Sequence, residues 1–234
     1  MTASIYATYQ DNSTHGEDSF LVKDLGDGNF LDVVLDGVTG HGGEEASQSV
    51  AEALISAEIT SLDDVVVVLE RMNAEFFQVG GGRFLLTTVS AALYQGGQLL
   101  TVSAGDSPIY HIRADSHQQL AGRVGGLLRP GGTKVIGGEE ILSLHRNELG
   151  VEPGDRLVIA SDGISDNLHV SELVEIIRGA SSPEDASQKV KALVEQHLEQ
   201  GLAPKLLGAR YRHDDQTGIF RFFTDSLMAA RPPG

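Results

Sequence analysis

Apolar and polar positions near the start of the chain follow a pattern that predicts three strands. Residues 4–9 alternate and are rich in β-prone side chains, and residues 18–22 repeat this pattern after a polar turn. Residues 30–35 form a nearly continuous apolar run, which is typical of a buried strand. We therefore expect the fold to begin with β-structure.

Helical spacing follows these strands. Between residues 46 and 57, apolar side chains recur at every third or fourth position, which predicts a helix with one buried face. The segment Ser61-Leu62-Asp63-Asp64 resembles a capping box and predicts the start of a second helix. The valines at 65–68 are β-branched, so a strand remains an alternative for that run.

The middle of the chain predicts an antiparallel meander. Residues 85–113 contain three short β-like runs, separated by turn segments at 95–98 and 105–108. Residues 156–160 form a clear strand that ends at Ser161-Asp162-Gly163, and residues 217–223 form a last one. The glycine-rich segment 122–138 predicts no particular element, and its Gly125-Gly126 and Gly131-Gly132 pairs are interpreted as a loose surface turn, with a mobile flap near the cleft as the alternative.

One more helix completes the expected order of elements. Ser182 is a suitable N-cap, Pro183 suits the first helical position, and two acidic residues follow at the positive end of the helix dipole. Strands and helices do not alternate regularly, so we expect an α+β fold rather than a parallel α/β sheet. No linker divides the chain, which predicts one domain over residues 1–234 with a frayed tail from about residue 226.

Composition excludes several classes of function. The net charge of −16 would repel nucleic-acid phosphates, so no nucleic-acid partner is expected. No apolar run approaches the ~20 residues that span a bilayer, so we expect no membrane association and a cytoplasmic protein. The chain has no cysteine, so a metal site must use carboxylate, imidazole or carbonyl ligands, which favours hard cations.

Acidic residues stand at strand ends and sharp turns. They are Glu17, Asp18, Asp36, Asp106, Asp162, Asp214 and Asp215. Taken singly, each is well explained as a turn former. Carboxylates brought together by sheet pairing would repel one another, however, and a bound cation is the usual way to neutralise such a cluster. The set therefore indicates a site for Mg²⁺ or Mn²⁺.

Six segments resemble, in order, the successive motifs of the protein phosphatase 2C (PPM) family of metal-dependent serine/threonine phosphatases. They are Glu17-Asp18-Ser19-Phe20, Leu35-Asp36-Gly37-Val38-Thr39-Gly40-His41-Gly42-Gly43, Thr87-Thr88, Ala104-Gly105-Asp106-Ser107, Ala160-Ser161-Asp162-Gly163-Ile164-Ser165-Asp166 and Asp214-Asp215-Gln216-Thr217. Each motif is weak alone, but their common order spans nearly the whole chain. The sequence is thus similar to the compact bacterial members of this family.

This resemblance implies a four-layer αββα sandwich, in which helix pairs flank a central antiparallel β-sandwich that carries a binuclear Mg²⁺ or Mn²⁺ site. Asp36 would contact both ions, the Gly37 carbonyl would bind one, and Asp162 would bind the other. Asp214 would join Asp162. Glu17 and Asp18 would act through ion-bound waters, and Asp106 would help to hold a weaker third ion.

The activity implied by the resemblance is hydrolysis of phosphoserine or phosphothreonine by a water that two ions activate. Asp36, Asp106 and Asp162 would be the catalytic carboxylates. No side chain need attack the phosphate, which agrees with the absence of cysteine and of a Gly-x-Ser-x-Gly elbow. We expect a monomer whose partner is a phosphorylated protein substrate.

Some positions depart from the family pattern. The segment 12–16 lacks the arginine that grips the substrate phosphate in many members, and His15 and Arg83 are the candidates to replace it. Val38 stands where eukaryotic members have a histidine proposed as general acid, and valine cannot donate a proton. His41 could bind substrate or an ion-bound water, or it could simply have backbone partners.

Two other functions stay open from the sequence alone. The missing arginine motivates a catalytically weak relative that serves as a signalling or binding module. The aspartates alone would also suit a metal-dependent hydrolase of nucleotides or small phosphate esters. The retained ligand set argues against the first of these, and no segment resembles a nucleoside pocket, so the phosphoprotein phosphatase is the interpretation that we carry forward.

Overall fold

A computed structural model of the chain describes residues 2–122, 134–200 and 212–225. Within these ranges the strands are β1 (Thr2–Asp11), β2 (Asp18–Gly26), β3 (Asn29–Asp36), β4 (Val89–Gln95), β5 (Gln98–Ala104), β6 (Ile109–Ile112), β7 (His117–Ala121), β8 (His145–Gly150), β9 (Arg156–Ala160) and β10 (Gln216–Asp225). The helices are α1 (Gly43–Ser56), α2 (Leu62–Gly80), α3 (Asp162–Ser165), α4 (Val170–Gly179) and α5 (Pro183–Gln200).

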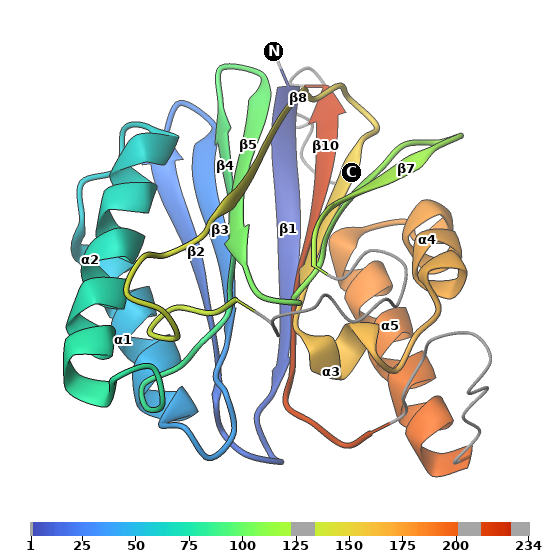
Figure 1. Cartoon of the computed structure of the whole chain (residues 1–234). Coiled ribbons are helices and arrows are strands. Elements are labelled where there is room, and N and C mark those ends of the chain that lie inside the picture. Colours follow the sequence, from blue (N-terminus) through green and yellow to red (C-terminus); the bar gives the residue numbers. More distant parts are fainter. Residues whose placement is uncertain (1, 123–133, 201–211, 226–234) are drawn as a thin grey trace.

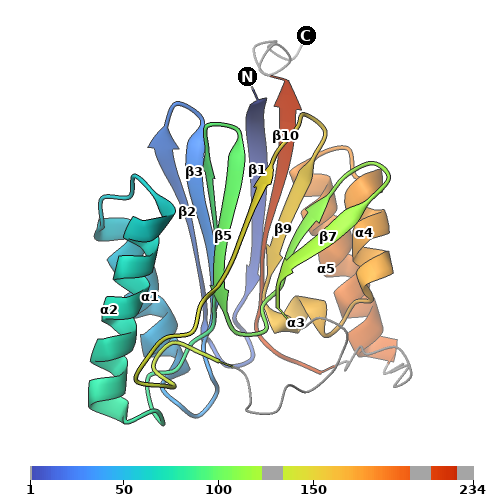
Figure 2. The same cartoon turned by 45° about the horizontal axis from the view of Figure 1, so that its top comes forward.

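The strands form two five-stranded antiparallel sheets that face each other. One sheet has the order β1-β10-β9-β6-β7, and the other has the order β2-β3-β4-β5-β8. Helices α1 and α2 cover the outer face of the second sheet, whereas α4 and α5 cover the first (Figures 1 and 2). This confirms the expected α+β class and the four-layer αββα arrangement.

Helix α2 is stabilised by a capping box at its start and by burial of one apolar face. The Ser61 side chain accepts a hydrogen bond from the Asp64 backbone N–H, and the Asp64 carboxylate accepts from the Ser61 backbone N–H, so the predicted capping box is confirmed. Residues 65–68 are helical, because three of these four valines pack into the core between α2 and the sheet. Burial of that apolar face overrides their preference for strands.

Strand β3 sends alternate side chains to the two cores that flank it. Leu31, Val33 and Leu35 pack toward α1 and α2, whereas Phe30 and Val34 pack between the sheets. Asp36 has the same phase as Val34 and is the last residue of β3. Its side chain is therefore expected at the rim of the space between the two sheets, which is where a site can form.

A buried ion pair crosses the same inter-sheet space. The Arg221 guanidinium of β10 donates to both carboxylate oxygens of Asp32 in β3, at 2.6 and 2.7 Å. The ring of Phe30 lies 3.6 Å from the guanidinium carbon. The pair is bidentate and buried, so each charge is neutralised by its partner. We therefore assign the pair a structural role.

The structure also corrects parts of the sequence interpretation. Leu85 has a positive φ of 58°, so no strand runs through residues 85–88, and β4 begins only at Val89. Helices α3 and α4 and strands β7 and β8 were not predicted. The glycine pairs at 125–126 and 131–132 and the tail from about residue 226 lie outside the described residues. No helix in the described ranges is both long enough and apolar enough to cross a bilayer.

Candidate metal centre

The register of the second sheet brings two carboxylates face to face. Asp18 of β2 is the direct antiparallel partner of Asp36 of β3. Asp18 is buried, and its Oδ2 atom has no hydrogen-bond partner within the described structure. Like charges directly opposite each other on a sheet are destabilising, so this pair has no structural benefit of its own. The pairing indicates a place where a cation would be bound.

Two threonines fix the backbone of Asp36. The Thr88 hydroxyl accepts from the Asp36 N–H at 3.1 Å, and the Thr88 N–H donates to the Asp36 carbonyl at 2.8 Å. The Thr87 hydroxyl donates to the same carbonyl at 3.1 Å. The Thr88 hydroxyl also lies 3.0 Å from the Ser107 hydroxyl, which connects Asp36 to the turn that carries Asp106. The Thr87-Thr88 motif therefore positions the end of β3.

Asp162 and Asp214 join this cluster from the other sheet. Asp162 follows β9 and opens the short helix α3, and its backbone N–H points to Asp36 Oδ2 at 3.4 Å. Asp214 lies just before β10. Both carboxylates pair with one nitrogen of Arg212, Nη2, at 2.7 Å for Asp162 and 2.6 Å for Asp214. Sequence reasoning missed Arg212, because nothing in its local pattern distinguishes it from a loop residue.

Asp215 holds the segment that carries Glu17. Its carboxylate accepts hydrogen bonds from the backbone N–H groups of Thr14, His15 and Glu17, at 3.1, 2.9 and 2.7 Å. The Glu17 carboxylate in turn accepts from the Thr39 hydroxyl of the glycine-rich loop after β3. Asp215 thus has an anchoring role that the sequence did not reveal, and it brings Glu17 to the loop at Gly37.

Gly37 and Gly163 permit close backbone approaches at the site. A Cβ on Gly37 would lie 2.4 Å from the Gly43 carbonyl group and 2.7 Å from the Glu17 carbonyl oxygen. A Cβ on Gly163 would lie 1.9 Å from the Asp215 carbonyl oxygen. Neither glycine has a positive φ, so it is close packing and not unusual backbone torsion that requires glycine here.

Burial and mutual repulsion disfavour ionisation of three of these carboxyl groups. Burial raises the pKa of Asp18 to about 7, and the charges of Asp215 and Asp162 add to it, whereas the hydroxyls of Ser161 and Thr217 act in the opposite direction. The pKa of Asp36 is raised well above its usual range, first by burial and then by Asp18, Asp162 and Asp106.

Asp162 is affected in the same direction. Burial raises its pKa to about 6, Arg212 acts against this, and Asp106, Asp166 and Asp214 contribute further repulsion. Burial alone would lower the pKa of the Arg212 guanidinium, but the surrounding aspartates raise it overall. In the absence of a bound cation, the negative charge of these carboxylates is therefore offset by protonation and by the Arg212 guanidinium.

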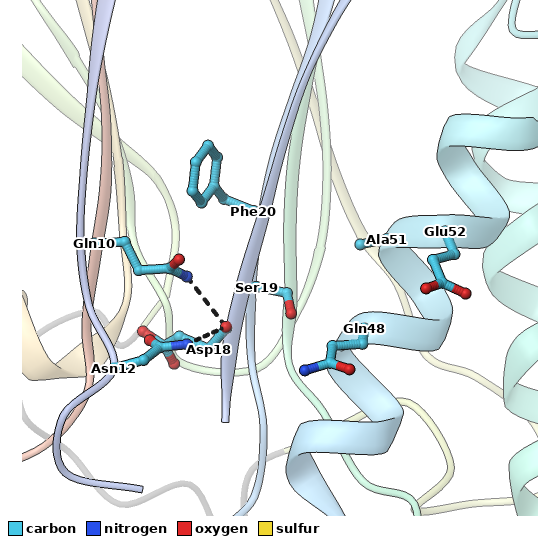
Figure 3. Close-up of a pocket in the computed structure, with 8 residues that line it drawn as sticks. All are labelled: Gln10, Asn12, Asp18, Ser19, Phe20, Gln48, Ala51 and Glu52. Atoms are coloured by element: carbon cyan, nitrogen blue, oxygen red, sulfur yellow. Dashed lines mark hydrogen bonds between the residues drawn. The ribbon is translucent and has the colours of Figure 1, made fainter. Parts of the chain in front are cut away.

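A pocket of about 310 Å³ opens beside Asp18, between β1, β2 and α1 (Figure 3). The Gln10 and Asn12 side chains of the β1 side donate to the Asp18 carbonyl at 3.1 and 2.8 Å, as the dashed lines in the figure show. Gln48 and Glu52 line the opposite wall from α1. The two amides connect the beginning of β2 to the β1 side, so they help to fix the position of Asp18 at the rim.

The donor set fits Mg²⁺ or Mn²⁺ in its chemistry. It offers several carboxylates, a buried Asp18 oxygen without a hydrogen-bond partner in the described ranges, and backbone carbonyls near Gly37. Hard cations prefer such oxygen ligands. Among the described residues, no three Asp, Glu or His side chains already have the geometry of a formed ion site. Arg212 bridges Asp162 and Asp214 instead, so these two side chains would have to turn toward an ion.

The two candidates for the missing phosphate-binding arginine have different surroundings. His15 Nδ1 lies 3.2 Å from Asp214 Oδ1, at the edge of the cluster. Arg83 lies at the glycine-rich loop, where its backbone carbonyl contacts His41 Nδ1 at 2.7 Å. This contact supports the interpretation of His41 as a loop histidine with backbone partners. Val38 is held in the loop by hydrogen bonds of its backbone.

One protein family and several solved structures are similar to this chain. The family model described as Stage II sporulation protein E (SpoIIE) matches residues 26–220. A search of curated proteins finds no match. Among solved structures, PppA, described as a key regulatory component of T6SS in Pseudomonas aeruginosa, has a TM-score of 0.77 at 22% identity, covering 95% of this chain and 100% of PppA.

Two solved serine/threonine phosphatases are also similar. The catalytic domain of PstP, in complex with two manganese ions, has a TM-score of 0.75 at 22% identity and covers 96% of this chain and 100% of its own. Stp1 from Staphylococcus aureus has a TM-score of 0.74 at 19% identity, with 93% and 94% covered. The fold of the chain is therefore that of bacterial serine/threonine phosphatases of the 2C type.

Proposed function

Because the chain belongs to the SpoIIE family, which is of the protein phosphatase 2C type, we propose that it is a metal-dependent phosphoprotein phosphatase. Its substrates would be phosphoserine or phosphothreonine in a protein. One observation carries this proposal. Asp18, Asp36 and Asp162 converge at the rim between the two sheets, where burial and repulsion raise the pKa of each. A carboxylate cluster of this kind is costly unless it serves to bind cations.

The residues that would hold two Mg²⁺ or Mn²⁺ ions follow from this placement. Asp36 is central, with Asp18 opposite it and Asp162 beside it, so it would contact both ions. The Gly37 carbonyl and Glu17 would serve one ion, and Asp162 with Asp214 the other. Asp106 is close enough to raise the pKa of Asp36 and Asp162, which supports a role with a weaker third ion. The two manganese ions of PstP support the stoichiometry.

Bound ions and the chain's own residues would have different roles in the reaction. Bound ions of this class would supply a polarised water and neutralise charge on the phosphoryl group. The chain's own residues orient the site: Thr87 and Thr88 fix Asp36, and Asp215 fixes the segment before β2. Val38 cannot protonate a leaving group, so that proton would have to come from water or from another group at this partly exposed rim.

A second candidate function is a phosphatase-like signalling or binding module with weak catalysis. The observation in its favour is that no lysine or arginine lies between Met1 and Phe20, where many relatives have their phosphate-binding arginine. PppA, which shares the fold, is itself described as a regulatory component. We favour the enzyme, because the carboxylate set is kept and because dedicated contacts fix the backbone of Asp36 and the segment that carries Glu17.

Steady-state kinetics on three substrates distinguish these functions. With Mn²⁺ present, we expect the highest kcat/KM on a phosphoserine peptide, lower values on an aryl phosphate and the lowest on a nucleoside monophosphate. Asp162→Asn is the matched inactive variant, because it keeps the shape of a side chain placed in the site. A nucleotide preference would make the chain a small-ester hydrolase, and turnover equal to that of Asp162→Asn on all three would favour the binding module.

A further inference from the structure

Arg212 contacts two carboxylates of the cluster. Its Nη2 atom lies 2.7 Å from Asp162 Oδ2 and 2.6 Å from Asp214 Oδ2. Its side chain is 49% exposed, whereas those of its two partners are 13% and 18% exposed. One guanidinium nitrogen thus contacts two largely covered carboxylates, while about half of the Arg212 side chain stays exposed.

The backbone of Arg212 is fixed although the side chain is exposed. The buried side chain of Asn167 donates to the Arg212 carbonyl at 3.0 Å and to the Gly163 carbonyl at 2.7 Å. Asn167 therefore connects Arg212 to α3, the helix that Asp162 opens. The point from which the guanidinium reaches the site is thus fixed relative to Asp162.

The chemistry of the guanidinium suits a phosphate. Arginine has five N–H donors in a planar fork that matches phosphate oxygens two at a time. In the described residues, the ion pairs with Asp162 and Asp214 use Nη2, which leaves donors on Nε and Nη1 for another anion. The segment 2–20 contributes no lysine or arginine, and Arg83 lies at the glycine-rich loop, where its backbone carbonyl contacts His41 Nδ1.

We propose that Arg212 binds the phosphate of the substrate, in place of the arginine that segment 12–16 lacks. This inference rests on the proposed phosphatase function. Each carboxylate oxygen that turns from Arg212 to a cation releases N–H donors, which then point into a site where a phosphate dianion needs them. Cation binding by Asp162 and Asp214 and phosphate binding by Arg212 are thus linked and favour each other.

The experiment measures binding of inorganic phosphate to the Mn²⁺-loaded protein by calorimetry, for wild type and for Arg212→Gln. We expect phosphate affinity to fall at least about tenfold, the scale of a lost charge-assisted bidentate contact. Arg212→Lys should fall between the two, because it keeps the charge and loses the fork. Arg83→Gln is the matched control at the rival arginine and should change phosphate affinity less than about twofold.

Metal titration of the cation-free protein provides a second readout. Arg212→Gln removes a competitor for Asp162 and Asp214, so Mn²⁺ should bind to it at least as tightly as to wild type. Phosphate affinity within about twofold of wild type in Arg212→Gln, or a loss that follows Arg83→Gln instead, would overturn the proposal. Loss of Mn²⁺ binding in Arg212→Gln would also overturn it, by reducing Arg212 to a support for the carboxylates.

These binding measurements do not depend on turnover. If wild type binds Mn²⁺ and phosphate through Arg212 but hydrolyses no phosphopeptide, the proposed enzyme function fails and the Arg212 assignment stands. If wild type is an active phosphatase and Arg212→Gln keeps its phosphate affinity, the assignment fails alone. In an active protein, Arg212→Gln should raise KM for an aryl phosphate by about the factor lost in phosphate affinity, with a smaller change in kcat.

Discussion

Replacing Asp18 by asparagine should stabilise the cation-free protein, although Asp18 is buried at the heart of the site. Burial raises the pKa of Asp18 from 3.8 to about 7. The folded protein therefore holds a proton that the unfolded chain releases, so this group lowers stability as the pH rises from about 4 to about 7. Above that range the full penalty applies, and the difference between the two pKa values corresponds to about 4 kcal/mol.

Asparagine removes this penalty but also weakens other contacts. The Asp18 carboxylate interacts with the hydroxyls of Ser161 and Thr217, and an amide replaces these bonds only in part, at a cost of about 1–2 kcal/mol. The net gain at pH 8 is thus about 2–3 kcal/mol. For a chain of 234 residues this corresponds to a rise in Tm of roughly 5–10 °C.

Thermal unfolding in EDTA at pH 8 and near pH 4 measures this effect. The gain of Asp18→Asn over wild type should be present at pH 8 and absent near pH 4, where Asp18 is protonated in the folded protein. Asp27→Asn, in the exposed turn of the same β2–β3 hairpin, is the control and should have the Tm of wild type at both values. A variant no more stable than wild type at pH 8, or equally stabilised at both, would refute the electrostatic account of the site.

Three further substitutions test other parts of the site. Asp36→Asn should weaken Mn²⁺ binding and lower kcat roughly 100-fold or more, as titration and steady-state kinetics would measure, and near-normal turnover would remove Asp36 from the centre of the site. Asp106→Ala should keep two bound ions but lose at least about tenfold in kcat, about 1.4 kcal/mol, and wild-type turnover would leave Asp106 as a turn residue. Gly163→Ala should cost about 3 kcal/mol in urea unfolding, because its Cβ would lie 1.9 Å from the Asp215 carbonyl, whereas Gly179→Ala, with nothing within 4 Å, should not.

Elements with strong local signals were predicted well from the sequence. The capping box at Ser61 starts α2, the proline at 183 starts α5, and the apolar run in residues 30–35 gives β3. Other elements lack such signals. Helix α4 begins after His169, which is not a typical N-cap residue, and β8 has no buried residue along its length. Tertiary contacts create these elements, so the local pattern could not reveal them.

The candidate site was predictable only in part for a similar reason. The carboxylates stand at strand ends, and strand ends can be read from apolar runs and turn residues. Their partners cannot be read in this way. Arg212 meets Asp162 across 50 residues of chain, and Asp215 anchors Thr14 across 201 residues. Such contacts depend on how β9, β10 and the segment before β2 come together, which no local pattern encodes.

The central claim is that this chain hydrolyses phosphoproteins with the help of bound cations, and one assay tests it most directly. Phosphate release from a phosphoserine peptide would be followed with Mn²⁺, after EDTA, and after Mn²⁺ is restored, for wild type and Asp36→Asn. We expect wild type to be active, to lose activity in EDTA and to regain it with Mn²⁺, while Asp36→Asn stays nearly inactive throughout. Full turnover by wild type in EDTA, or no turnover with saturating Mn²⁺, would contradict the account.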